Sequence, residues 1–180
     1  MLYCFLAQGF EETEAIAPID LLRRAGIDVR TVGVGAKTVA GSHGIPVVCD
    51  LTEDEITLNA ALEGVILPGG MPGTLNLEKS AAVQSALDYC AANGRLLCAI
   101  CAAPSVLGHK GYLKGKEAIA FPGFEKELAG ARISSRSVVT DGSVITAKGA
   151  GVAVEFGLAV VAALKGAAAA AAIGEAIQCK

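Results

Sequence analysis

The sequence predicts an α/β protein with a flavodoxin-like order of elements: a doubly wound, mostly parallel sheet, helices on both faces and an added β-hairpin. Short apolar runs alternate with amphipathic helical patterns along the 180 residues, as in sheets built with crossover helices. Hydrophobic residues make up 53% of the chain and aromatic residues 4%, which suits strands buried on both faces. No repeat or linker interrupts the alternation, so we expect residues 1–180 to form one domain.

The apolar runs are predicted to form strands. Single strands are expected over residues 2–7, 28–34, 64–70, 95–101 and 117–121. Two further segments predict hairpins, because runs of strand-forming residues flank a turn sequence in each. Residues 37–50 turn at GSHG, and residues 137–149 turn at Asp141-Gly142.

Helical patterns fill the intervals between the strands. They are expected over residues 11–26, 80–94 and 151–166, from Pro104 onward, and for one or two turns within 122–130. The alanine-rich tail after residue 166 is expected to be helical as well.

The stretch 156–174 is the only candidate membrane span in the sequence. Lys165 and Gly166 lie at its centre and weakly apolar alanines dominate it, so a helix docked on the core is expected. The N-terminus lacks the basic region of a signal peptide. The net charge of −3 gives no electrostatic reason to bind nucleic acid or an anionic membrane. We therefore expect a cytoplasmic protein with neither partner.

The six cysteines lie at positions 4, 49, 90, 98, 101 and 179, without the spacing of a disulfide framework. No Cys/His spacing resembles a zinc site, so neither a metal nor a cofactor is predicted. Cys98 and Cys101 match CxxC, but both fall in a strand-like run, where residues three apart are about 10 Å apart and face opposite sides. That separation exceeds disulfide reach, so a redox dithiol is not expected.

Three loops with unusual chemistry follow the predicted strands. They are GFEETE after the first strand, LPGG after the third long strand, and CAAP after the fourth. Ligands of open parallel sheets bind beyond the carboxyl ends of the strands. If these strands are neighbours, the three loops form one pocket.

Cys101 is the candidate nucleophile. It lies where a strand gives way to a helix, with small neighbours in Ala102 and Ala103, and Pro104 suits the first helical turn. This is the pattern of a nucleophile elbow, and the helix N-terminus is expected to lower the pKa of the thiol. The alternative is a buried strand cysteine, a description that fits Cys98 better.

Glu14 is the candidate acid. Beside a thiolate its pKa would be raised, so that it stays protonated, donates a hydrogen bond to sulfur and moves a proton. Judged from its position in the expected helix alone, Glu14 could equally be an ordinary acid on the helix surface. Glu11 and Glu12 are expected to be solvated acids that stabilise the first helical turn.

The motifs GFEETE, VILPGG, AICAAP, FPGFEKEL and GAGVAVEFGLAVV, in this order along nearly the whole chain, resemble the ThiJ/PfpI superfamily and most of all its DJ-one-like subfamily. The resemblance implies a flavodoxin-like fold and a homodimer, with Cys49 near the dimer contact. It also implies that Cys101 is an oxidisable nucleophile hydrogen-bonded by Glu14. The backbone N–H groups of Gly70 and Ala102 would form an oxyanion-type pocket.

Some residues of this sequence differ from the motifs of the wider superfamily, and these differences disfavour some of its activities. Phe121 stands where some relatives have a histidine near the cysteine, and Ala102 stands where the protease-like branch has one. No histidine follows His109, so the His/Glu pair of class I amidotransferases is missing. A cysteine peptidase is therefore disfavoured. His109 is expected at a helix end and His43 in a turn, with the alternative that this turn overhangs the pocket.

These residues predict a cysteine-dependent enzyme acting on small reactive dicarbonyls or glycated proteins, as a glutathione-independent glyoxalase, a deglycase or both. Attack of the Cys101 thiolate on methylglyoxal would give a hemithioacetal, and proton transfer by Glu14 would lead to lactate. The alternative is an oxidative-stress sensor or redox-regulated chaperone, because the same thiol oxidises to sulfenic and sulfinic acid. Both hypotheses depend on the sulfur of Cys101, and the sequence does not decide between them.

Overall fold

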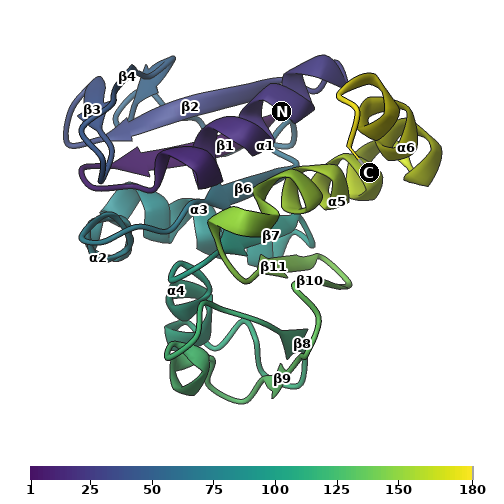
Figure 1. Cartoon of the computed structure of the whole chain (residues 1–180). Coiled ribbons are helices and arrows are strands. Elements are labelled where there is room, and N and C mark those ends of the chain that lie inside the picture. The colour runs from purple at the N-terminus through teal and green to yellow at the C-terminus, as the bar shows by residue number, and fades with distance from the viewer. Residues whose placement is uncertain (180) are drawn as a thin grey trace.

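The computed structural model describes residues 1–179 and confirms the doubly wound sheet (Figure 1). The strand order is β10-β11-β7-β6-β1-β2-β5, and β10 with β11 is the antiparallel pair. The strands of this sheet are β1 (Leu2–Ala7), β2 (Val29–Val34), β5 (Leu51–Thr52), β6 (Gly64–Leu67), β7 (Leu96–Ile100), β10 (Val138–Asp141) and β11 (Val144–Ala147). The predicted hairpin at Asp141-Gly142 joins the sheet because β11 pairs in parallel with β7.

Helices cover both faces of the sheet (Figure 1). Those on one face are α1 (Glu12–Arg24) and α5 (Ala153–Lys165), and those on the other are α2 (Gly73–Lys79), α3 (Ala81–Ala92) and α4 (Pro104–His109). A glycine lets α5 approach α1 closely, since a Cβ at Gly157 would lie 2.9 Å from the Cα of Pro18. The sheet is therefore buried from both sides, as the composition predicts.

Four short strands lie outside the main sheet. β3 (Thr38–Ala40) and β4 (Pro46–Val48) form the predicted antiparallel hairpin, while β8 (Glu117–Ala118) and β9 (Arg132–Ile133) pair in parallel. The strand expected over residues 117–121 is therefore shorter than predicted and outside the main sheet, because its partner is β9. The sequence patterns also miss α2, β5 and β9, which are too short to show a clear period.

The apolar C-terminal stretch forms a helix where residues 151–166 predict one, and the alanine-rich tail forms another. α5 ends at Lys165, Gly166 adopts a φ of +88°, and α6 (Ala167–Ala176) follows. The left-handed backbone that glycine permits ends α5 and redirects the chain. α5 itself docks on the core through Phe156 and neighbouring apolar residues, as expected. Among residues 1–179 no helix combines the length and apolar character needed to cross a bilayer.

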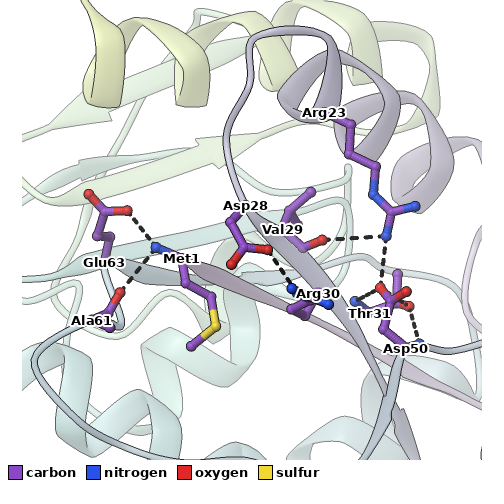
Figure 2. Close-up of polar contacts among 9 residues, drawn as sticks. All are labelled: Met1, Arg23, Asp28, Val29, Arg30, Thr31, Asp50, Ala61 and Glu63. Atoms are coloured by element: carbon purple, nitrogen blue, oxygen red, sulfur yellow. Dashed lines mark hydrogen bonds and ion pairs between the residues drawn. The ribbon is translucent and has the colours of Figure 1, made fainter.

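Ion pairs hold the amino-terminal ends of the strands (Figure 2). The Met1 amino group lies 2.6 Å from a Glu63 oxygen, which joins the start of β1 to the start of β6. Arg23, near the end of α1, contacts Asp50 at 2.7 Å, and Asp50 also accepts hydrogen bonds from Thr31 of β2. The opposite, carboxyl-terminal edge of the sheet is left for the candidate site.

Candidate active site

The three loops singled out in the sequence lie side by side. β7, β6 and β1 are consecutive in the sheet, and all three run parallel, so their carboxyl ends meet at one edge. The loop after β1 leads into α1, which carries Glu14. The loop after β6 holds Gly69 and Gly70, and the residue after β7 is Cys101. The predicted convergence of these loops is therefore confirmed.

Cys101 forms the sharp turn that the sequence predicts. Its φ is +67°, a left-handed conformation that costs a non-glycine residue about 1–3 kcal/mol. Two hydrogen bonds hold this backbone: the Cys101 N–H donates to Ala147 at 2.9 Å, and the Cys101 carbonyl accepts from Phe121 at 2.8 Å. Pro104 begins α4 directly afterwards, as expected. The residue as a whole is partly exposed.

Glu14 points inward from α1 toward Cys101. It is 1% exposed, and its Oε2 accepts a hydrogen bond from the Gly69 N–H at 2.9 Å. A Cβ at Gly69 would lie 2.7 Å from both Glu14 Oε2 and Cys101 Cβ, so a larger residue there would push the two apart. The carboxyl and the Cys101 thiol are also near enough for each to shift the pKa of the other. The structure thus decides in favour of a buried Glu14 over a surface role.

The two predicted backbone donors also reach the sulfur. The N–H groups of Gly70 and Ala102 both lie near enough to the Cys101 thiol to lower its pKa. Gly70 has a φ of +87°, and a Cβ there would lie 2.4 Å from the Glu11 nitrogen. Only glycine fits this close approach of two loops. Cys101, Glu14, Gly70 and Ala102 are therefore brought together.

Cys101 and Glu14 titrate as one unit. Burial raises the pKa of Glu14 from 4.5 to about 7, against hydrogen bonds from Cys101 and the Gly69 N–H that lower it. Burial and the charge of Glu14 raise the pKa of Cys101 to about 12, and the N–H groups of Ala102 and Gly70 lower it less. The expectation that a helix N-terminus lowers this thiol pKa is therefore wrong, because burial and a facing carboxylate outweigh the backbone donors.

The rise at Cys101 comes partly from the Glu14 charge, so it describes the loss of a second proton from the pair. Above a pH of about 7 the pair holds one proton and one negative charge. The pKa of about 7 for Glu14 and of about 12 for Cys101 place that charge on the carboxylate and the remaining proton on sulfur, so the thiol faces its own proton acceptor.

Glu12 differs from its expected role as a solvated acid. Its side chain is buried, and its Oε1 accepts hydrogen bonds from the N–H groups of His43 at 2.9 Å and Ile45 at 3.3 Å. Burial raises its pKa, but these hydrogen bonds and that of the His43 ring lower it to about 2 overall. Glu12 thus anchors the loop between β3 and β4. Glu11, at the N-cap of α1, is half-buried and makes no capping hydrogen bond with its side chain.

Glu11, Glu12 and His43 place ligand atoms within 4.8 Å of one another, the geometry that a metal ion requires. The oxygens of Glu12 already accept the loop N–H groups, and the His43 ring is 70% exposed. This cluster therefore serves to hold the loop. His43 lies in a turn, as predicted.

The remaining histidine and cysteines take structural positions. His109 ends α4, where its two ring nitrogens contact Glu78 at 2.5 Å and Glu127 at 3.1 Å. The cysteines of residues 1–179 are all free. Cys98 is fully buried in β7, and Cys49 is also buried.

Some residues of the site were not predicted from the sequence. The N–H groups of Gly69 and Ala150 hydrogen-bond Glu14, and Gly149 lies beside it. Gly69 and Gly149 belong to LPGG and to GAGVAVEFGLAVV, motifs that carry the resemblance. The small size of Gly69 and Gly149 within these motifs was therefore the available signal, but it does not identify what either residue does.

Comparison with known proteins finds relatives along most of the chain. The sequence profile of the DJ-1/PfpI family matches residues 2–163. The Parkinson disease protein 7 homolog of Danio rerio is 37% identical over 166 residues, which are 90% of this chain and 88% of that protein. Protein DJ-1 homolog A of Arabidopsis thaliana is 36% identical over 166 residues, 89% of this chain, which spans 42% of its length. Deglycase PH1704 of Pyrococcus horikoshii is 29% identical over 145 residues, 79% of this chain and 86% of that protein.

Solved structures give the same picture. A mutant of a DJ-1 superfamily protein from Salmonella typhimurium matches with a TM-score of 0.92 at 37% identity, covering 98% of this chain and 97% of that one. Oxidized DJ-1 of Toxoplasma gondii matches with a TM-score of 0.93 at 31% identity, with the same coverage. The flavodoxin-like fold and the family resemblance expected from the five motifs are therefore confirmed.

The raised pKa of Glu14 predicts that the free energy of unfolding falls as pH rises from 4.5 to about 7. The folded chain keeps the Glu14 proton through this window, whereas the unfolded chain has released it, so raising the pH favours unfolding. Relative to Glu14→Gln, the wild type should lose about 3 kcal/mol across the window. Urea unfolding of both proteins at the two ends of the window measures the difference.

Other titrating groups are present in both proteins and cancel in this comparison. Glu12, whose pKa is lowered to about 2, changes stability below the window and with the opposite sign. Equal pH slopes for wild type and Glu14→Gln would contradict a buried, titrating Glu14.

Proposed function

Since the chain belongs to the DJ-1/PfpI family, we propose that it is a cysteine-dependent enzyme that acts on reactive dicarbonyl compounds and converts methylglyoxal to lactate without glutathione. The observation that carries the proposal is the buried pair of Cys101 and Glu14, which holds one proton and one charge near pH 7. The proposal includes repair of glycated proteins by the same thiol, an activity supported by the name of the Pyrococcus relative. It also places the enzyme in the cytoplasm, where free cysteines stay reduced.

The first step uses the shared proton. The Cys101 thiol passes its proton to the Glu14 carboxylate, and the sulfur lone pair forms a bond to the aldehyde carbon as the C=O π bond breaks. The N–H groups of Gly70 and Ala102 face the reacting sulfur and would hold the oxyanion that develops. Return of the proton from Glu14 gives a neutral hemithioacetal.

The second step moves hydrogen between two carbons. The Glu14 carboxylate removes the proton from the carbon that bears sulfur, which gives an enediolate. It returns that proton to the neighbouring carbon, while the hydroxyl proton passes to the former ketone oxygen. The product is a thioester of lactic acid on Cys101. Water hydrolyses it, releasing lactate and restoring the thiol, so the net reaction consumes one water. On a glycated side chain the same attack would displace the amine, which leaves with a proton.

We expect purified protein to consume methylglyoxal without glutathione, at a rate that rises with pH through about 7 as the pair loses its first proton. Cys101→Ser should reduce consumption to background, and Glu14→Gln should lower kcat by about 10²–10⁴-fold because the proton carrier is lost. Lactate formation, followed by chromatography, is the measurement. Cys179→Ser is the matched control, since Cys179 is an exposed cysteine. Unchanged turnover in Cys101→Ser would remove the proposal.

A second candidate function is an oxidative-stress sensor or redox-regulated chaperone. It is favoured by the partial exposure of Cys101 and by the backbone donors that would stabilise a sulfinate as they would an oxyanion. The Toxoplasma structure described above is that of an oxidized protein. Each equivalent of peroxide transfers one oxygen atom to the sulfur, and the rest of the peroxide leaves as water.

Mild peroxide should oxidise Cys101 before the other cysteines. Cys179 provides a sharp internal control because it is exposed, whereas Cys101 is only partly exposed. If exposure alone decided reactivity, Cys179 would be oxidised first; if the pair activates sulfur, Cys101 is first. Mass spectrometry of tryptic peptides over a peroxide series distinguishes the two, and uniform or Cys179-first oxidation would count against the sensor.

The proposal also includes a homodimer, which rests on an exposed apolar surface. Ile16 of α1 and Val48 of β4 line one groove and are 44% and 72% exposed, and Ile45 of the same hairpin is 57% exposed. Cys49, which the resemblance places near the dimer contact, is buried next to Val48. Three large apolar side chains on neighbouring elements are typical of an interface.

We expect sedimentation velocity to show a dimer, and Val48→Asp to shift it toward monomer because a charge would be buried at the contact. Ile133→Asp is the control, since Ile133 is an exposed apolar residue on β9, outside this groove. A wild-type monomer, or a dimer unaffected by Val48→Asp, would contradict this surface as the interface.

A further inference from the structure

Phe121 holds an aromatic ring beside the Cys101–Glu14 pair. A Cβ built on Gly149 would lie 3.2 Å from Phe121 Cδ2 and 3.9 Å from Glu14 Oε1, so the ring and the carboxyl border the same small space. The Phe121 side chain is nevertheless 47% exposed. One part of the ring therefore packs on Gly149, and another part is exposed to solvent.

Hydrogen bonds hold the turn that carries this ring. The Phe121 N–H donates to the Cys101 carbonyl, and the Phe121 carbonyl accepts from Phe124 at 3.0 Å. The Gly123 N–H donates to the Glu125 carboxylate at 2.6 Å, which closes the turn. The backbone that carries the ring is thus tied to the backbone of Cys101, which limits the backbone entropy lost when a ligand contacts the ring.

The charges around the pair are negative. The pair itself carries one charge above a pH of about 7, and the neighbouring Glu11 carboxylate raises the pKa of Glu14. The pKa of His43 is raised by its hydrogen bond to Glu12 and by the charge of Glu11, so its ring offsets part of this charge at an exposed position. An anionic substrate is therefore repelled near sulfur, whereas a neutral carbonyl compound is not.

We propose that Phe121 is a specificity-determining residue that makes the site prefer neutral carbonyl substrates with a flat apolar substituent, such as an aryl group. The inference rests on the proposed attack of Cys101 on a dicarbonyl. The N–H groups of Gly70 and Ala102 attract the carbonyl oxygen, which leaves the substituent to be directed toward the Phe121 ring. Aryl groups gain there from offset or edge-to-face contact, and a methyl group does not.

Turnover of phenylglyoxal and methylglyoxal tests the proposal, because the two compounds differ in the substituent alone. Phe121→Ala should lower the ratio of their kcat/KM values by about tenfold, the size of one aromatic contact. Phe121→Tyr keeps a ring and should keep the ratio of the kcat/KM values. Phe121→Leu keeps apolar volume but no ring, and should lose most of the preference for phenylglyoxal. Ile133→Ala, which removes an apolar side chain that is also 47% exposed, is the matched control and should change nothing.

Ratios are compared because a change at Phe121 also alters the surroundings of Glu14, which affects both substrates alike. An unchanged ratio in Phe121→Ala and Phe121→Leu would overturn the proposal. So would an equal loss of kcat/KM for both substrates, since that would mark Phe121 as a residue that only positions the Cys101 backbone.

Alkylation of Cys101 gives a readout that does not depend on turnover. Phenacyl bromide and bromoacetone carry the two substituents, and iodoacetamide and iodoacetate differ in charge. Alkylation rates at Cys101 are measured by mass spectrometry and divided by the rates with a small free thiol. The normalised rate should be higher for phenacyl bromide than for bromoacetone, and higher for iodoacetamide than for iodoacetate. The aryl preference should disappear in Phe121→Ala and persist in Ile133→Ala.

The two assays separate the two levels of the argument. An aryl preference in alkylation without turnover of either dicarbonyl would refute the proposed function and support the selectivity. Equal normalised rates for phenacyl bromide and bromoacetone would overturn the role of Phe121, whatever the turnover.

Discussion

The site depends on one buried contact, in which Glu14 and Cys101 share a proton. A carboxyl that is 1% exposed keeps its proton to a pH of about 7, and the facing thiol cannot ionise fully beside a carboxylate. The pair therefore carries one charge at neutral pH, and the sulfur has its own proton acceptor. In the proposed mechanism this acceptor does the work of the histidine that some relatives have at the position of Phe121.

The fold makes this contact by bringing three strand ends together. β1, β6 and β7 are adjacent and parallel, so an acid from α1, two glycines and a cysteine meet although they are far apart in the sequence. Gly69 is small enough for Glu14 to reach Cys101, and two hydrogen bonds hold the strained backbone of Cys101. Ion pairs such as Met1–Glu63 lie at the other edge of the sheet, so the chemistry and much of the charged anchoring are separated.

Local patterns predicted much of the architecture. Residues 2–7 and the hairpin over 137–149 were identified correctly because an apolar run and an Asp-Gly turn are local signals. The failures have tertiary causes. β8 pairs with β9 outside the main sheet, so the strand expected over residues 117–121 is shorter than predicted. Glu12 is buried because the loop after β3 supplies N–H groups to it, a partner some thirty positions away.

The sequence by itself determined the family, the order of strands and helices, and the position of the candidate nucleophile, because an apolar run ending in Cys-Ala-Ala-Pro is a local pattern. It also named Glu14, Gly70 and Ala102, through the motifs that surround them. Only the tertiary structure decided the ionisation of the pair, which turned out opposite to the expected lowering of the Cys101 pKa. The reason is physical: a pKa depends on burial and on charges across space, and these are set by which strands become neighbours.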